Sequence, residues 1–128
     1  MTRWATLDGV GSVLTEIIVD AADVRRLAGF WAAVLGWEVT EEDDDGVEIA
    51  PAGGGKPTLV FVPVPEAKAG KNRVHLDVNP TGCEQDEELA RLRSLGATDV
   101  DVGQGDRTWY VLADPEGNEF CLLRTRVG

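Results

Sequence analysis

The order strand, helix, strand, strand, strand is predicted twice along the chain, and this repeat limits the fold more than any other feature. The first copy spans about residues 12–64, the second about residues 72–125, and residues 65–71 form a linker between them. One helix in each copy can cover only one face of its four-stranded sheet. The sequence therefore predicts a single α+β domain over residues 1–128. In it, two βαβββ modules in tandem form a curved eight-stranded, barrel-like sheet around a cleft.

Apolar residues at helical spacing predict one helix in each module. The first covers residues 24–35 and follows Asp23, a good N-cap, and the second covers residues 84–95. Each ends at a glycine suited to a left-handed C-cap. In the second helix, Glu87 and Arg91 are four residues apart and are expected to form an ion pair.

Short apolar runs between turn residues predict the strands. In the first module the predicted strands cover residues 13–20, 37–40, 47–50 and 58–64, and in the second residues 73–78, 97–102, 108–113 and 119–125. The acidic run at 41–45 predicts a solvated hairpin loop, because it lacks the ligand spacing of a calcium loop. Residues 103–107 predict a further turn, in which Arg107 is solvated or meets an anionic ligand.

The last hairpin is predicted from Asp114-Pro115-Glu116-Gly117, since proline sets the first corner of a turn and glycine supplies a left-handed residue. This turn brings Glu119 to the start of an otherwise apolar strand. A buried carboxylate without a partner is costly. The charged side chain of Glu119 at the start of this strand therefore needs a reason.

Composition excludes several classes of function. The net charge of −11 argues against nucleic acid and against anionic membrane surfaces as partners. The two cysteines, Cys83 and Cys121, match no metal spacing and are too few for a disulfide framework. No apolar stretch approaches the ~20 residues of a membrane span, and the first residues do not resemble a signal peptide. Cytoplasmic localisation is the expectation.

Three segments together resemble the vicinal oxygen chelate superfamily, which includes glyoxalase I, the bleomycin-resistance proteins and the extradiol dioxygenases. The resemblance covers about residues 12–125 and is closest to small stand-alone glyoxalase-like domain proteins of bacteria. It rests on Phe30-Trp31-Ala32-Ala33-Val34-Leu35-Gly36-Trp37, Lys71-Asn72-Arg73-Val74-His75-Leu76-Asp77-Val78 and Asp114-Pro115-Glu116-Gly117-Asn118-Glu119-Phe120. It implies paired βαβββ modules, frequently assembled as homodimers, and does not by itself imply glyoxalase activity.

The resemblance also implies where metal ligands would lie, on the first and last strand of each module. In the second module, His75 and Glu119 occupy these positions and suit Zn, Ni, Mn or Fe. In the first module, Ile18 occupies the position that matches His75, and Glu16 is the nearest substitute ligand. This set predicts no cofactor, or at most a weakly held divalent metal. Without metal, His75 is expected to pair with Glu119 or Asp77.

Four residues are predicted to line the ligand cleft, namely Ile18, Asp77, Trp109 and Cys121. The indole of Trp109 could stack there on a planar ligand. Trp31, by contrast, lies on the apolar stripe of the first helix and is predicted to be structural.

Three functions fit this sequence. The first is a metal-free protein that binds a small organic molecule in the cleft between the modules. The second is a metal-dependent lyase, isomerase or dioxygenase that uses His75 and Glu119, with the metal as a Lewis acid. The third is a metal-free enzyme in which His75 is the general acid or base, assisted by Glu119 or Asp77. Whether the protein is an enzyme is left open by the sequence.

Overall fold

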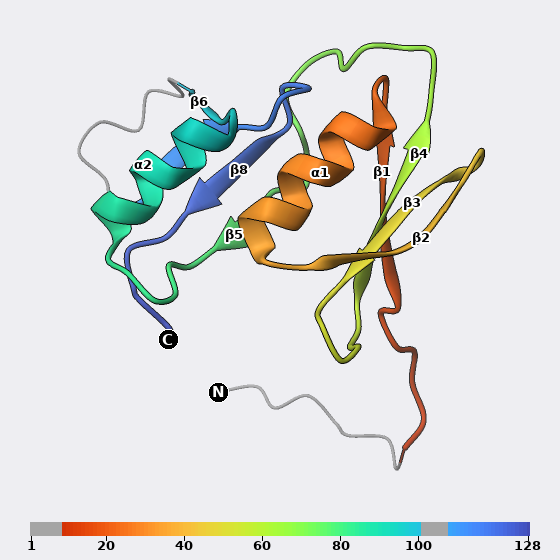
Figure 1. The fold of residues 1–128 in the computed structure, drawn as a ribbon, viewed down its shortest axis with the longest axis horizontal. Helices are drawn as coiled ribbons and strands as arrows, with labels where there is room; N and C mark the ends of the chain where they lie inside the picture. The colour runs from red at the N-terminus through yellow and green to blue at the C-terminus, as the bar shows by residue number, and fades with distance from the viewer. Residues whose placement is uncertain (1–8, 101–107) are drawn as a thin grey trace.

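The computed structural model describes residues 9–100 and 108–128, in which two helices and eight strands follow one another (Figure 1). The first half contains β1 (Glu16–Ala21), α1 (Val24–Leu35), β2 (Glu38–Asp43), β3 (Gly46–Ala50) and β4 (Thr58–Pro63). The second half contains β5 (Leu76–Val78), α2 (Gln85–Leu95), β6 (Thr98–Asp99), β7 (Tyr110–Ala113) and β8 (Glu119–Leu122). This order confirms the predicted βαβββ repeat.

The strands form two four-stranded mixed sheets, in the orders β1-β4-β3-β2 and β5-β8-β7-β6. In each sheet the first strand of the module pairs in parallel with the last, and the other pairs are antiparallel. Within the described residues, β1 and β5 are edge strands that do not pair with each other. The paired modules are therefore confirmed, whereas the single eight-stranded, barrel-like sheet is corrected to two separate sheets. Side-chain packing rather than strand pairing joins the modules.

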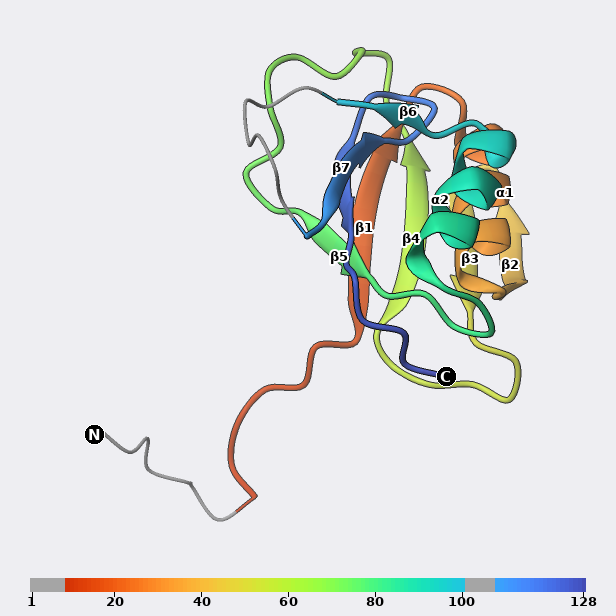
Figure 2. The ribbon, with the colours of Figure 1, turned by 90° about the vertical axis from the view of Figure 1, so that its left-hand side faces the viewer.

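In Figure 2 both helices lie to the right of β1, β4, β5 and β7. Along β1, Ile17, Val19 and Ala21 pack into the core, so that Glu16 and Ile18 alternate onto the opposite face of the sheet. Side chains from both modules form one continuous hydrophobic cluster.

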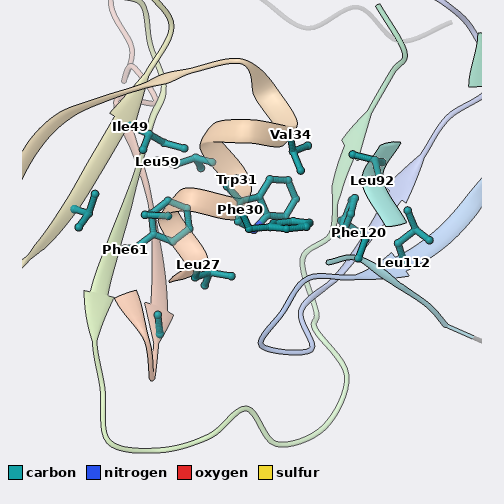
Figure 3. Close-up of a cluster of buried hydrophobic side chains, with 14 of the residues drawn as sticks. Leu27, Phe30, Trp31, Val34, Ile49, Leu59, Phe61, Leu92, Leu112 and Phe120 are labelled. Atoms are coloured by element: carbon teal, nitrogen blue, oxygen red, sulfur yellow. The ribbon is translucent and has the colours of Figure 1, made fainter. Parts of the chain in front are cut away.

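Helix α1 is the centre of this cluster, because its apolar side chains contact both modules (Figure 3). Its own sheet contributes Ile49, Leu59 and Phe61 on one side. On the other side the ring of Trp31 lies against Phe120 of β8, with 4.8 Å between ring centroids. The prediction that Trp31 is a core residue is confirmed, since only 3% of it is exposed.

The helix boundaries follow the local signals in the sequence. Helix α1 begins after Asp23, whose side chain accepts a hydrogen bond from the Arg26 amide, and ends at Gly36 with φ 66°. Helix α2 starts one residue later than predicted, because Glu84 is its N-cap and its backbone N–H donates to the Glu87 side chain. The Glu87 side chain is thus used at the N-cap, and the predicted ion pair is instead formed by Arg91 and Glu88, with 2.7 Å between Nε and Oε1. Neither described helix is long and apolar enough to cross a membrane.

Several strand boundaries differ from the sequence-based prediction. Strand β5 is only three residues long, and Val74, expected within it, is 78% exposed. Strand β2 extends through Glu41 to Asp43, so that the predicted acidic loop is reduced to the turn at 44–45. The predicted turn at 103–107, with Arg107, lies outside the described residues.

The turn before β8 docks the second module onto the first through the carboxylate of Asp114. One oxygen, Oδ2, accepts a hydrogen bond of 3.0 Å from the indole Nε1 of Trp31. The other, Oδ1, accepts hydrogen bonds from the amides of Glu116 and Asn118 within the turn. The turn residue Gly117 has φ 87°, as predicted for a left-handed glycine. Asp114 therefore stabilises the turn and holds it against α1 at the same time.

The second module also supplies charges to both ends of α1. This helix has no acidic residue in its first turn and no basic residue in its last. At its N-terminus, the Glu116 carboxylate accepts hydrogen bonds of 2.7 Å from the amides of both Ala22 and Asp23. At its C-terminus, the Arg91 guanidinium donates to the carbonyl oxygens of Ala33 and Val34. These charges oppose the helix dipole at each end and so favour docking of the modules.

Asp114→Asn is expected to destabilise the protein by about 2–4 kcal/mol, because the new NH₂ group faces buried N–H donors. Asp114 is only 3% exposed, so water cannot replace the lost acceptor. The free energy of unfolding is measured by urea denaturation followed by circular dichroism. The control Asp44→Asn makes the same chemical change at an exposed turn residue and is expected to shift the stability by less than about 0.5 kcal/mol. Equal effects of the two substitutions would contradict the proposed role of Asp114.

Candidate functional site

A pocket of about 400 Å³ lies at the junction of the two modules. Its apolar lining comes from both of them: Ile17, Ile18 and Val19 of β1, Trp31 of α1, Leu76 of β5 and Phe120 of β8. Residues of the segment that joins β4 to β5 and residues of the turn before β8 complete the lining. Volumes of about 300–1,000 Å³ are typical of small-molecule sites.

The shape of the connecting segment brings a lysine into this pocket. The segment passes from the end of β4 to the start of β5 as a long loop (Figure 1). Its Lys68 ammonium contacts Oε1 of Glu119 at 2.8 Å and also donates to the Gly70 carbonyl. The Lys68 side chain is 20% exposed and Glu119 is 9% exposed, so this ion pair is largely shielded from water.

The buried carboxylate of Glu119 is therefore paired with the Lys68 ammonium. Besides Lys68, the backbone N–H of Asn72 lies 3.3 Å from each carboxylate oxygen. The Lys68 ammonium holds the pKa of Glu119 below its ordinary value, against the opposing effect of burial, and the Asn72 amide adds to the lowering. Glu119 is an ionised, hydrogen-bonded acceptor at neutral pH.

His75 lies outside the described lining of the pocket. Its side chain is exposed, and its Nε2 lies 2.9 Å from the Asn72 carbonyl oxygen. His75 and Glu119 thus both contact Asn72, through its carbonyl and its amide respectively. No hydrogen bond or ion pair of the described residues joins His75 to Glu119 or to Asp77. The catalytic role assigned to His75 stays a prediction.

The other predicted site residues are divided between this pocket and the far face of the second sheet. Ile18 lines the pocket, half exposed. Asp77 and Cys121 are register partners on β5 and β8, and Trp109 is half-buried just before β7. None of these three is among the described lining residues. Burial, and next the charge of Asp77, raise the pKa of the Cys121 thiol, which favours its unreactive protonated form.

The described residues of one chain do not fit the metal site that the family resemblance implies. Within residues 9–100 and 108–128, no group of three His, Cys, Asp or Glu side chains is placed to hold a metal ion. Glu16 lies on β1 opposite Thr58, and one oxygen of Glu119 already binds the Lys68 ammonium.

Sequence reasoning singled out only Ile18 and Glu119 among the described lining residues; Trp31, Lys68 and Glu116 are three of those that it missed. Trp31 was correctly placed in the core, but a helical stripe does not reveal that a core side chain also borders a cavity. Glu116 was visible within the turn motif, although its contact with α1 depends on how the modules pack. For Lys68 the sequence offered no signal, because its position follows from the path of an irregular segment.

In a comparison with known protein families, residues 16–123 of the chain match the glyoxalase-like domain family. Among curated proteins, none matches the chain. Several solved structures share its fold.

One is the genomically encoded fosfomycin resistance protein FosX from Listeria monocytogenes, with a TM-score of 0.70 and 16% identity over 91% of this chain and 93% of that one. A FosX mutant complexed with Mn(II) and 1S,2S-dihydroxypropylphosphonic acid matches with a TM-score of 0.63 and 13% identity, over 89% of this chain and 90% of that one. A glyoxalase/bleomycin resistance protein/dioxygenase family enzyme from Burkholderia phytofirmans matches with a TM-score of 0.65 and 18% identity, over 87% of this chain and 97% of that one.

The depressed pKa of Glu119 predicts a pH-dependent contribution to stability. A carboxylate whose pKa is lower in the folded state stabilises the fold above its unfolded pKa of about 4.3, and this effect is lost as the pH falls through the folded value. Glu119→Gln is therefore expected to reduce the free energy of unfolding most near neutral pH. The difference from wild type should shrink as the pH falls below about 4.

Urea denaturation of both proteins across this pH range measures the difference. Glu38→Gln, at an exposed position of β2, is the control and is expected to stay within about 0.5 kcal/mol of wild type throughout. A Glu119→Gln difference that does not change with pH would contradict the ion pair with Lys68.

Proposed function

Because the chain belongs to the glyoxalase-like domain family of the vicinal oxygen chelate superfamily, we propose that it binds a small, largely apolar molecule in the pocket between its modules, without a divalent metal at Glu119. The pocket itself is the observation that carries this proposal. It has a suitable volume, and apolar side chains from both modules face it. Structural relatives of this fold include a FosX mutant complexed with Mn(II) and a small phosphonic acid, so the fold can accommodate a small molecule.

The two enzyme hypotheses receive less support from the geometry. A metal-dependent lyase, isomerase or dioxygenase needs His75 and Glu119 as ligands of one ion, but Glu119 is bound to Lys68. A metal-free acid/base enzyme needs His75 beside the bound molecule, but His75 is exposed outside the described lining. Lys68 supplies a positive charge beside the carboxylate, and this ion pair supports the metal-free proposal.

Filling the pocket is expected to weaken binding of a neutral hydrophobic dye. We expect wild-type protein to bind Nile red with an increase in dye fluorescence, and Ile18→Trp to weaken this binding about tenfold or more by placing an indole in the pocket. Val39→Trp is the matched control, since Val39 is 52% exposed against 51% for Ile18 but lies outside the pocket lining. Equal binding by the two variants would contradict the pocket as the site.

Elemental analysis of the same preparation, followed by titration with Zn(II), Ni(II), Mn(II) and Fe(II), tests the metal-free part of the proposal. We expect no stoichiometric metal and no change in Nile red affinity on addition of metal. Stoichiometric metal that is lost in Glu119→Ala would instead favour the metal-dependent enzyme.

We also propose that two copies of the chain associate through the sheet faces that the helices leave uncovered (Figure 2). Ile18 of β1 and Val60 of β4 are register partners on this face, and burial of the half-exposed Ile18 together with the partly buried Val60 would favour association. Sedimentation velocity is expected to show a species of twice the chain mass of 13.8 kDa. Val60→Glu should produce monomers, whereas Val39→Glu, on an edge strand, should not. A wild-type monomer at micromolar concentration would overturn the proposal.

A further inference from the structure

The charges around the pocket are strongly unbalanced. Its described lining contains five carboxylates, from Asp20, Glu66, Asp114, Glu116 and Glu119, and a single ammonium, from Lys68. That ammonium is already paired with Glu119. An anionic ligand would find no free cation among the described lining residues and would be repelled by the remaining carboxylates.

Three of the five carboxylates have structural partners. Asp114 accepts hydrogen bonds from Trp31 and from its own turn, Glu116 accepts from the N-terminus of α1, and Glu119 binds Lys68. The other two, Asp20 and Glu66, have no hydrogen-bond or ion-pair partner among the described residues. Asp20 projects from β1 and Glu66 from the connecting segment, and both are exposed. They are therefore free to pair with a ligand at the border between the apolar lining and water.

We propose that the ligand is an organic amine, protonated at neutral pH, with an aliphatic or aromatic body. This inference deepens the proposed function and rests on it. The body of the amine lies against the more exposed apolar lining residues, such as Ile18 and Leu76, and its ammonium pairs with Asp20 or Glu66. A cation is the charge type that these two carboxylates favour, and the chain's net charge of −11 adds a long-range attraction for cations.

This ligand class is tested by measuring how strongly three competitors with the same eight-carbon chain displace Nile red from the protein. These are octylamine, octanol and octanoate, which present a cationic, a neutral and an anionic head group. We expect octylamine to compete about three to ten times more strongly than octanol, and octanoate most weakly, because a partly exposed ion pair contributes a modest attraction. The preference should decrease as salt is added, since salt screens exposed charges.

The double variant Asp20→Asn with Glu66→Gln is expected to bring the affinity for octylamine close to that for octanol and to leave octanol unchanged. Glu41→Gln with Asp86→Asn is the matched control, because it removes the same net charge at exposed positions outside the pocket and should preserve the preference. An identical loss in both double variants would mean that overall charge, and not these two side chains, selects the ligand.

The outcomes separate this inference from the proposed function. If Nile red is displaced equally by all three competitors, or best by octanoate, the pocket binds apolar molecules but the amine preference is overturned. If Nile red does not bind, or Ile18→Trp binds it as well as wild type does, both the pocket function and the amine preference are overturned.

Discussion

The hydrogen bond from the Trp31 indole to the Asp114 carboxylate is the contact on which the arrangement of the two modules depends. Asp114 and Trp31 are buried, and one carboxylate both stabilises the turn before β8 and accepts from α1 of the other module. A displaced turn would leave a buried acceptor and a buried donor without partners, which is costly in an apolar interior. Trp31 and Phe120 therefore lie in contact, and the pocket forms beside them at the junction.

The sequence repeat does not make the two modules equivalent. Helix α1 receives the Glu116 carboxylate at its N-terminus and the Arg91 guanidinium at its C-terminus, both from the second module. Helix α2 instead has its own acidic first turn and an arginine in its last turn. The first helix is therefore adapted to packing between modules, whereas the charges of the second favour it locally.

Local signals were enough to predict the helices, the turn at Asp114 and the order of elements. Asp23 and Gly36 define α1 through capping, and alternation placed Ile17 and Ile18 on opposite faces of β1. The two separate sheets and the short β5 could not be predicted in this way, because they depend on how the modules pack. The partner of Glu119 was missed for the same reason: Lys68 is fifty-one residues away in an irregular segment, and no periodic pattern fixes its position.

The Lys68–Glu119 pair shows how one residue of a connecting segment changes what a family position can do. A carboxylate at the start of the last strand can hold a metal only if its oxygens are free and other ligands are near. Here the ammonium of Lys68 contacts Oε1 of Glu119, and the Asn72 amide lies 3.3 Å from each of its oxygens. The pair also anchors the connecting segment beside the pocket, so the group that neutralises the carboxylate helps to shape the site. In this chain the carboxylate therefore takes part in the structure of the pocket through Lys68 and Asn72.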